Sequence, residues 1–224
     1  MTNLLKSANG FTFVKVAVII MTVGVLVGVI MIMIALSEQS FMRNIISEHN
    51  RYQSFVMTFK QKYDQLPGDT TKALAFMGTE AIRNGNGNRK IEYSLGENAL
   101  AWKHLFVAKI MNSPELSGEE GFMAVLGENI PASLVSDGGW HFDYAKDSGG
   151  NHLGFGAEKE NDINMSPIMT PMQAYEIDKR LDDGQRTSGR VHGFSISGQS
   201  CGEDSYAIEI KTIECMLTFN LEAQ

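Results

Sequence analysis

The feature that most constrains this chain is a run of 21 residues without a charge, from Val16 to Leu36. A helix rises about 1.5 Å per residue, so the run covers the roughly 30 Å hydrocarbon core of a bilayer. A secretory signal peptide is the alternative interpretation, because Ala35-Leu36-Ser37 offers small residues at a cleavage position. The apolar region of a signal peptide normally spans about 7–15 residues, so the length favours a membrane-spanning helix.

The helical pattern continues beyond the apolar run. Large apolar residues recur there mostly at steps of three, four or seven, with a gap near His49: Phe41, Ile45, Tyr52, Phe55, Val56, Phe59 and Tyr63. This spacing places them on one side of a helix, and no helix-breaking residue occurs before Pro67. The sequence therefore predicts one helix from Phe11 to about Tyr63, on the order of 80 Å long, with an amphipathic second half.

Charge divides the chain at the end of this helix. The first 63 residues hold six basic and two acidic residues, whereas residues 64–224 hold 13 basic and 24 acidic residues, a net charge of −11. Lys6 and Lys15 precede the span, which favours a cytoplasmic N-terminus and an exported head, although Arg43 weakly opposes this. The acidic head does not favour a nucleic acid partner. Its best basic cluster flanks an acidic turn and consists of Lys179, Arg180, Arg186 and Arg190.

The residues after Pro67 predict an α+β head. Helices are expected over residues 97–112 and from Thr170-Pro171 to Leu181, where Asp182-Asp183-Gly184 ends the second helix. Alternating apolar residues predict strands over residues 140–146, 153–157, 190–197, 206–211 and 215–221. Consecutive strands joined by short turns pair antiparallel, so we expect a C-terminal antiparallel sheet.

Ser7-Ala8-Asn9-Gly10 followed by Phe11-Thr12-Phe13-Val14 and a long apolar helix resembles the prepilin processing site of type IV pilins and type II secretion pseudopilins. The resemblance implies cleavage after Gly10 by a dedicated peptidase and methylation of Phe11. Further similarity to one bacterial pilin-like subfamily lies in Tyr63–Asp69, Asn84–Asn88, the helix containing Trp102 and the paired C-terminal cysteines.

The family implies the division of the chain and its surroundings. Residues 1–10 would be the leader peptide, 11–36 the transmembrane and filament-core helix, 37–66 its amphipathic half, and 67–224 the head, with the long helix packed on the sheet. Expected partners are other pilin or pseudopilin subunits, the prepilin peptidase, the inner-membrane assembly platform and the lipid bilayer. The head would lie in the periplasm, or outside the cell in an assembled filament. The alternative is an uncleaved single-span protein whose exported domain binds a ligand or cell-wall component.

Three positions in the helix bear on subunit contacts. The family usually has a glutamate at the fifth mature position, where this chain has Lys15. Lysine reverses the charge that would meet a neighbouring subunit's N-terminal ammonium, so it either extends to the nearby interface or marks a minor or tip subunit. Gly24 and Gly28 form a G-x-x-x-G pattern, which suits close helix association in lipid or is an ordinary flexible point.

The remaining chemistry of the sequence is sparse. Cys201 and Cys215 are the only cysteines, and in an exported domain they favour a disulfide over a metal or redox pair. Asn84–Asn88 superficially resembles a calcium loop, but its neutral amides favour consecutive tight turns. His104 lies on an apolar helical face, as a core histidine does. We therefore expect no catalytic residue, no resident metal, no cofactor and no enzymatic activity.

Overall fold

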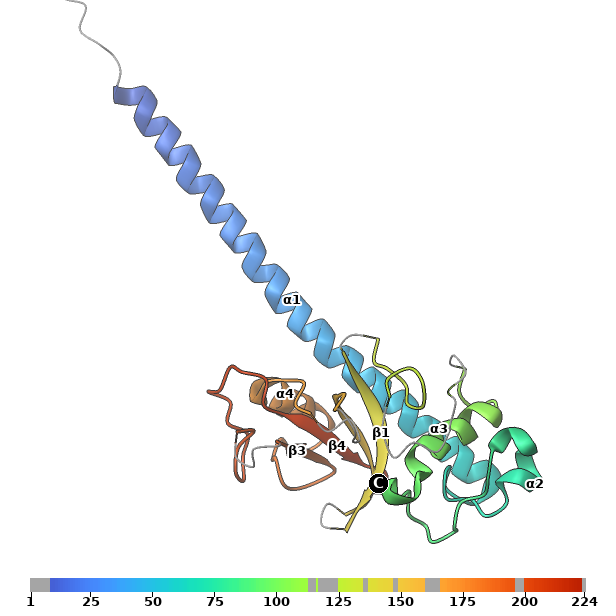
Figure 1. Ribbon diagram of the computed structural model, residues 1–224. Coiled ribbons are helices and arrows are strands. Elements are labelled where there is room, and N and C mark those ends of the chain that lie inside the picture. The colour runs from blue at the N-terminus through green and yellow to red at the C-terminus, as the bar shows by residue number, and fades with distance from the viewer. Residues whose placement is uncertain are drawn as a thin grey trace, which may run out of the picture. The chain divides into compact units, whose positions relative to one another are not determined.

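The computed structural model describes residues 9–112, 116, 125–134, 137–146, 149–159, 166–195 and 200–222, with side chains from Phe13 onward (Figure 1). The chain divides into two compact units, residues 1–41 and residues 42–224. Helix α1 (Asn9–Tyr63) begins in the first unit and ends in the second. The predicted long helix is confirmed, since it ends at Tyr63, four residues before Pro67.

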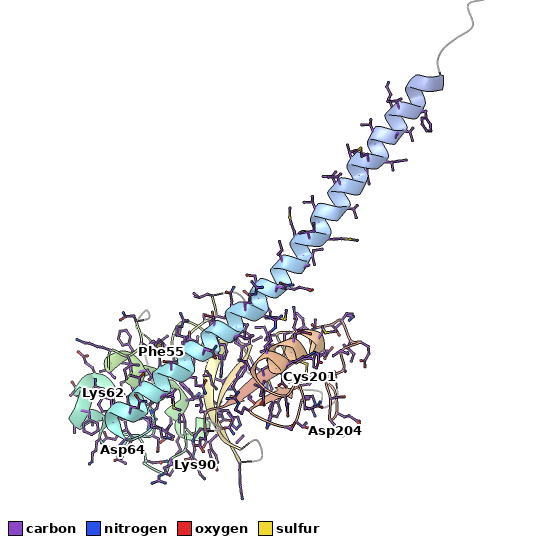
Figure 2. All side chains as sticks on the ribbon, turned by 180° about the vertical axis from the view of Figure 1, so that it is seen from behind. Phe55, Lys62, Asp64, Lys90, Cys201 and Asp204 are labelled. Carbon is purple, nitrogen blue, oxygen red and sulfur yellow. A yellow bond between two sulfur atoms is a disulfide. The ribbon has the colours of Figure 1, made fainter. Side chains whose placement is uncertain are left out.

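Between Val16 and Leu36, within the first unit, α1 is apolar on all sides. The large side chains from Phe13 to Leu36 are exposed all around the helix (Figure 2). Its most apolar stretch has a mean hydropathy of 3.0, and the helix is long and apolar enough to cross a membrane. A helix with no polar face is stable only where lipid or other apolar surfaces cover it. The composition of this unit is therefore that of a membrane anchor.

In the second unit α1 contributes one wall of the head's core. The predicted stripe supplies the buried side chains Ile45, Tyr52, Val56 and Phe59, while its other members, Phe41, Phe55 and Tyr63, are half-buried. Met42, which was not predicted, is buried beside them. The gap in the stripe is not exposed, because Glu48 and His49 fill it and are only 5% and 7% exposed. The helix then ends where Asp64 adopts a left-handed backbone conformation with φ 56°.

The head contains a four-stranded antiparallel sheet. Its strands are β1 (Gly138–Ala145), β2 (Gly150–Ala157), β3 (Val191–Phe194) and β4 (Met216–Asn220), in the spatial order β1-β2-β4-β3. Trp140 of β1 packs against Phe155 of β2 and Phe219 of β4, with ring centroids 4.8 and 5.7 Å away. Tyr52 of α1 lies 5.7 Å from the Trp140 ring. The amphipathic half of α1 therefore packs on the sheet, and the α+β fold class is confirmed.

Two further helices flank the sheet, and three short ones were not predicted. Helix α4 (Pro171–Leu181) starts at a capping box, in which Thr170 and Gln173 each bond the other's backbone N–H. Helix α3 (Glu97–Val107) packs against β1. The short helices lie between α1 and α3 and are α2 (Ala73–Met77), η1 (Thr79–Ala81) and η2 (Tyr93–Leu95).

Two predictions for the head are wrong in part or in full. Helix α3 does not extend to Asn112, because Lys109 takes φ 56° and the N–H of Met111 turns back to the carbonyl of Leu105. Residues 206–211 form successive turns and not a strand: Ala207 N–H bonds Cys201, and Ile210 N–H bonds Ala207. These turns lie inside the loop that the Cys201–Cys215 disulfide closes, and that disulfide is confirmed.

The strand predicted over residues 190–197 is present as β3, which ends at Phe194. Residues 196 and 197 lie outside the described residues. The exposed edge of β3 is occupied by side chains of the preceding loop. Arg186 donates from its guanidinium to the carbonyl of Gly193 at 2.7 Å, and its own carbonyl accepts from Gly193 N–H at 3.0 Å. These contacts use backbone groups that an open edge would offer to another strand.

Candidate functional site

The residues of the resemblance lie at the start of α1. Gly10 and Phe11 are in its first turn, and the backbone is already helical from Asn9. Lys15 follows one turn later and is exposed. Cleavage after Gly10 would therefore leave the helix beginning at its new N-terminus.

Gly24 and Gly28 are one helical turn apart in the exposed apolar unit. A Cβ atom built on either glycine meets no atom within 4 Å. Their neighbours on the helix are bulky and exposed, such as Val25, Leu26 and Val29. The two glycines therefore form a shallow notch in an otherwise bulky apolar surface, where a second helix backbone can approach closely.

The head contains a loop anchored by a buried carboxylate, residues 84–90, which we call the asparagine loop. Asp69, 3% exposed, accepts from the N–H groups of Gly87 at 2.7 Å and Asn88 at 3.0 Å on Oδ1. Its Oδ2 accepts from Arg89 N–H at 2.8 Å. Burial raises the pKa of Asp69, and these three hydrogen bonds oppose the rise. One side chain thus fixes three consecutive backbone groups of the loop.

Two residues of α3 hold the same region from the other side. Glu97 accepts from the N–H groups of Asn86 and Glu92, both at 3.1 Å. His104 accepts from Gly68 N–H at 3.0 Å through Nδ1, and its Nε2 lies 3.1 Å from the Arg83 carbonyl. Burial lowers the pKa of His104 to about 4, so the ring is neutral at pH 7. This is the core histidine bonded to a carbonyl that the sequence predicts.

The asparagine loop has little room for change and contains no carboxylate of its own among residues 84–90. A Cβ on Gly85 would lie 2.2 Å from the Gly68 carbonyl oxygen, so the two backbones are in direct contact. The N–H of Asn88 bonds Asn86 Oδ1 at 2.8 Å, and the N–H of Lys90 bonds Asn88 Oδ1 at 2.9 Å. The asparagines therefore make successive tight turns.

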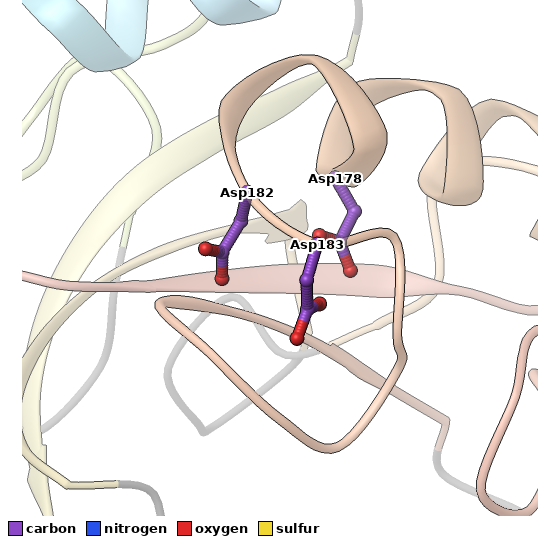
Figure 3. A group of neighbouring side chains, drawn as sticks. All are labelled: Asp178, Asp182 and Asp183. Atoms are coloured by element: carbon purple, nitrogen blue, oxygen red, sulfur yellow. The ribbon is translucent and has the colours of Figure 1, made fainter.

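A second carboxylate group lies at the end of α4, where Asp178, Asp182 and Asp183 can bring oxygens within 4.8 Å of one another (Figure 3). Asp178 is buried and accepts from Tyr206 Oη at 2.8 Å and from Gly184 N–H at 3.0 Å. Asp182 accepts from Arg190 N–H, and Asp183 accepts from Ser188 Oγ at 2.6 Å. Asp178 thus ties the turn after α4 to the disulfide loop, Asp182 ties it to the start of β3, and Asp183 holds the turn itself.

Burial dominates the electrostatics of this group. It raises the pKa of Asp178 to about 6, although the bonds from Tyr206 and Gly184 favour the charged form. Burial and the neighbouring Asp178 also raise the pKa of Tyr206. By contrast, the hydroxyl of Ser188 lowers the pKa of the exposed Asp183.

A groove of about 630 Å³ lies beside the second half of α1. It is lined by Arg51, Tyr52, Phe55, Lys109, Ile110, Met111, Asn112, Leu116, Gly127, Pro131, Ala132, Ser133 and Leu134. This described lining holds no histidine, cysteine or carboxylate that could act as a general base beside Ser133.

No protein-family model, curated protein or solved structure matches the chain.

Sequence reasoning did not identify Glu48, Asp69 or Asp178 as anchoring residues. Glu48 falls in the gap of the apolar stripe. A charged residue on the core-facing side of the helix was the signal that could have identified it as a buried anchor. Asp69 had no comparable signal, because its partners lie 18 to 20 residues further along the chain.

Proposed function

We propose that this chain is a structural subunit, minor or at the tip, of a type IV pilus or a type II secretion pseudopilus, and is not an enzyme. The observation that carries the proposal is the contrast within α1. The large apolar side chains of residues 16–36 are exposed on every side of the helix, whereas residues 42–63 supply core side chains to a folded head. Such a helix can leave lipid for a bundle of like helices without unfolding its head, because both surroundings cover apolar surface.

Processing would precede assembly. The segment around Gly10 and Phe11 resembles the prepilin cleavage and methylation site, and Lys6 on its N-terminal side favours a cytoplasmic leader. After removal of residues 1–10, the inner-membrane platform would lift the subunit from the bilayer, with its head on the periplasmic side. The role of the chain is then mechanical: apolar helices form the filament core and heads cover it.

Replacing the glycine before the cut tests this function. The variant Gly10→Leu should keep residues 1–10, remain in the membrane fraction and be absent from sheared filaments. The matched control is Gly24→Leu, which adds the same bulk to the helix at a position with open space around it and should be cleaved normally. Immunoblots of membrane and filament fractions measure both outcomes. If neither the parent nor the control is shortened, the uncleaved anchored protein is the correct account.

A further inference from the structure

The asparagine loop contains two Asn-Gly pairs, Asn84-Gly85 and Asn86-Gly87. An asparagine followed by glycine is chemically reactive, because the absence of a Cβ lets the glycine nitrogen reach the asparagine side chain. The nitrogen loses its proton and attacks Cγ, a C–N bond forms, and the side-chain amide leaves as ammonia. Water then opens the cyclic imide to aspartate or isoaspartate. No oxidant, metal or enzyme is needed.

Both attacking nitrogens are already engaged in the folded head. Gly87 N–H donates to Asp69 twice, to the backbone oxygen at 2.9 Å and to Oδ1 at 2.7 Å. Gly85 N–H donates to the carbonyl of Thr70 at 2.8 Å. The reaction must remove the backbone proton of Gly87, and the hydrogen bond from this N–H to a carboxylate makes that proton harder to remove.

The asparagine side chains are held as well. Asn84 Oδ1 accepts from Leu74 N–H at 3.0 Å, and Asn86 Oδ1 accepts from Asn88 N–H at 2.8 Å. The Nδ2 of Asn86 donates to Glu92 Oε2 at 3.3 Å. Each amide therefore has a partner other than the nitrogen that would attack it, and the attack requires these contacts to open first.

We infer that the two Asn-Gly pairs form a latent deamidation site that the folded head keeps closed, with Asp69 holding the second pair, independently of the filament role. The reaction at position 86 would replace a donor to Glu92 with a second carboxylate. Two carboxylates at that distance repel, so the loop could not return to its original contacts. Opening of the loop would thus become a permanent change in the head.

The full-length protein in detergent tests this inference without any substitution. It is incubated in mildly alkaline buffer, folded or unfolded in urea, and deamidation of each asparagine is followed by peptide mass mapping. Deamidation at Asn84 and Asn86 should be slower by about tenfold or more in the folded chain, because a reaction of the opened state follows its population. Asn88 precedes Arg89 and is the internal reference that should react slowly in both states. Equal rates in the folded and unfolded chain would overturn the inference.

Asp69→Ala then assigns the protection to Asp69. In this variant deamidation at Asn86 should rise toward the rate of the unfolded chain. The control Asp64→Asn removes an exposed carboxylate that lines the same pocket as Gly87 and should keep the slow rate, since asparagine tolerates the left-handed backbone at position 64. Circular dichroism establishes that both variants are folded. Asp69→Asn, which keeps the size of the side chain and loses its charge, replaces the alanine variant if that variant unfolds. A folded Asp69 variant that reacts as slowly as the parent contradicts the role of Asp69.

Discussion

The indole Nε1 of Trp140 on β1 donates a 2.7 Å hydrogen bond to the carboxylate of Glu48 on α1. The second oxygen of Glu48 accepts from the N–H of Leu134 at 2.9 Å. Glu48 is 5% exposed, and its contact with Trp140 lies in the aromatic core, whereas its contact with Leu134 is only partly buried. The gap in the apolar stripe of α1 is therefore the position at which the helix is hydrogen-bonded to the sheet and to the loop before it.

We expect Glu48→Ala to destabilise the head by about 2 kcal/mol, because it leaves the buried indole N–H of Trp140 without an acceptor. Glu48→Gln keeps one acceptor oxygen and should cost less. The matched control is Glu38→Ala, which removes an exposed carboxylate from the first unit. Urea unfolding followed by tryptophan fluorescence measures all three variants. A head as stable in Glu48→Ala as in Glu38→Ala would show that this contact does not hold the helix to the sheet.

Gly85→Ala should destabilise the head by about 1–3 kcal/mol, because its new methyl group would lie 2.2 Å from a backbone oxygen that cannot move aside. Gly24→Ala adds the same methyl group where no atom lies within 4 Å, so the stability of the head should not change. Thermal unfolding in detergent gives the comparison. Equal midpoints for the two variants would refute the close contact between residues 68 and 85.

The buried carboxylate of Asp178 should make the stability of the head depend on pH. Its pKa is raised from 3.8 to about 6 in the folded head, so the folded chain binds this proton more tightly than the unfolded chain. The resulting stabilisation is complete below about pH 4 and is lost as the pH rises to about 6. Asparagine does not ionise, so Asp178→Asn should not lose this stabilisation. The difference in unfolding free energy between Asp178→Asn and the parent should therefore shift in favour of the variant as the pH rises between these two values.

Asp183→Asn is the control, because its effect on stability should change with pH in the opposite direction. The pKa of Asp183 is lowered by the Ser188 hydroxyl, so its charged form stabilises the head above its ordinary pKa and that contribution is lost as the pH falls below it. The unfolding free energy that Asp183→Asn loses relative to the parent should thus become smaller at acidic pH. If the pH profiles of the two variants have the same slope, burial does not set the protonation of Asp178.

Lys15→Glu tests whether this chain occupies a special place in the filament. A glutamate at that position can pair with a neighbouring subunit's N-terminal ammonium, whereas a lysine repels it, and an unpaired charge in apolar surroundings costs several kcal/mol. We expect the variant to be incorporated in more copies along the filament than the parent. Quantitative mass spectrometry of sheared filaments counts the copies, with Lys15→Arg, which keeps the positive charge, as the control. Identical numbers would mean that Lys15 does not restrict the position of the subunit.

Elements with a periodic signature could be predicted from the sequence. The apolar run and the stripe that ends at Tyr63 both extend over many helical turns, so the last residue of α1 could be predicted. Apolar residues alternate in the sequence of β1, β2 and β4, and these strands were predicted to within a few residues. The pair Thr170 and Pro171 is a local signal, and it predicted the start of α4.

Contacts between distant segments left no such signature. Tyr206, Ile208 and Ile210 alternate like a strand, but the disulfide loop turns them so that Tyr206 is buried and Ile208 is 40% exposed. The turn segment at Asp69 and the asparagine loop were each recognised separately. Their connection depends on a carboxylate that reaches 18 to 20 residues along the chain, which no spacing rule encodes.

The measurement that tests the central claim most directly is the intact and N-terminal mass of the chain purified from its native membrane. The filament-subunit account predicts a chain that lacks residues 1–10 and begins with a methylated Phe11. A native chain that still carries Met1–Gly10 and is monomeric in the bilayer would contradict it.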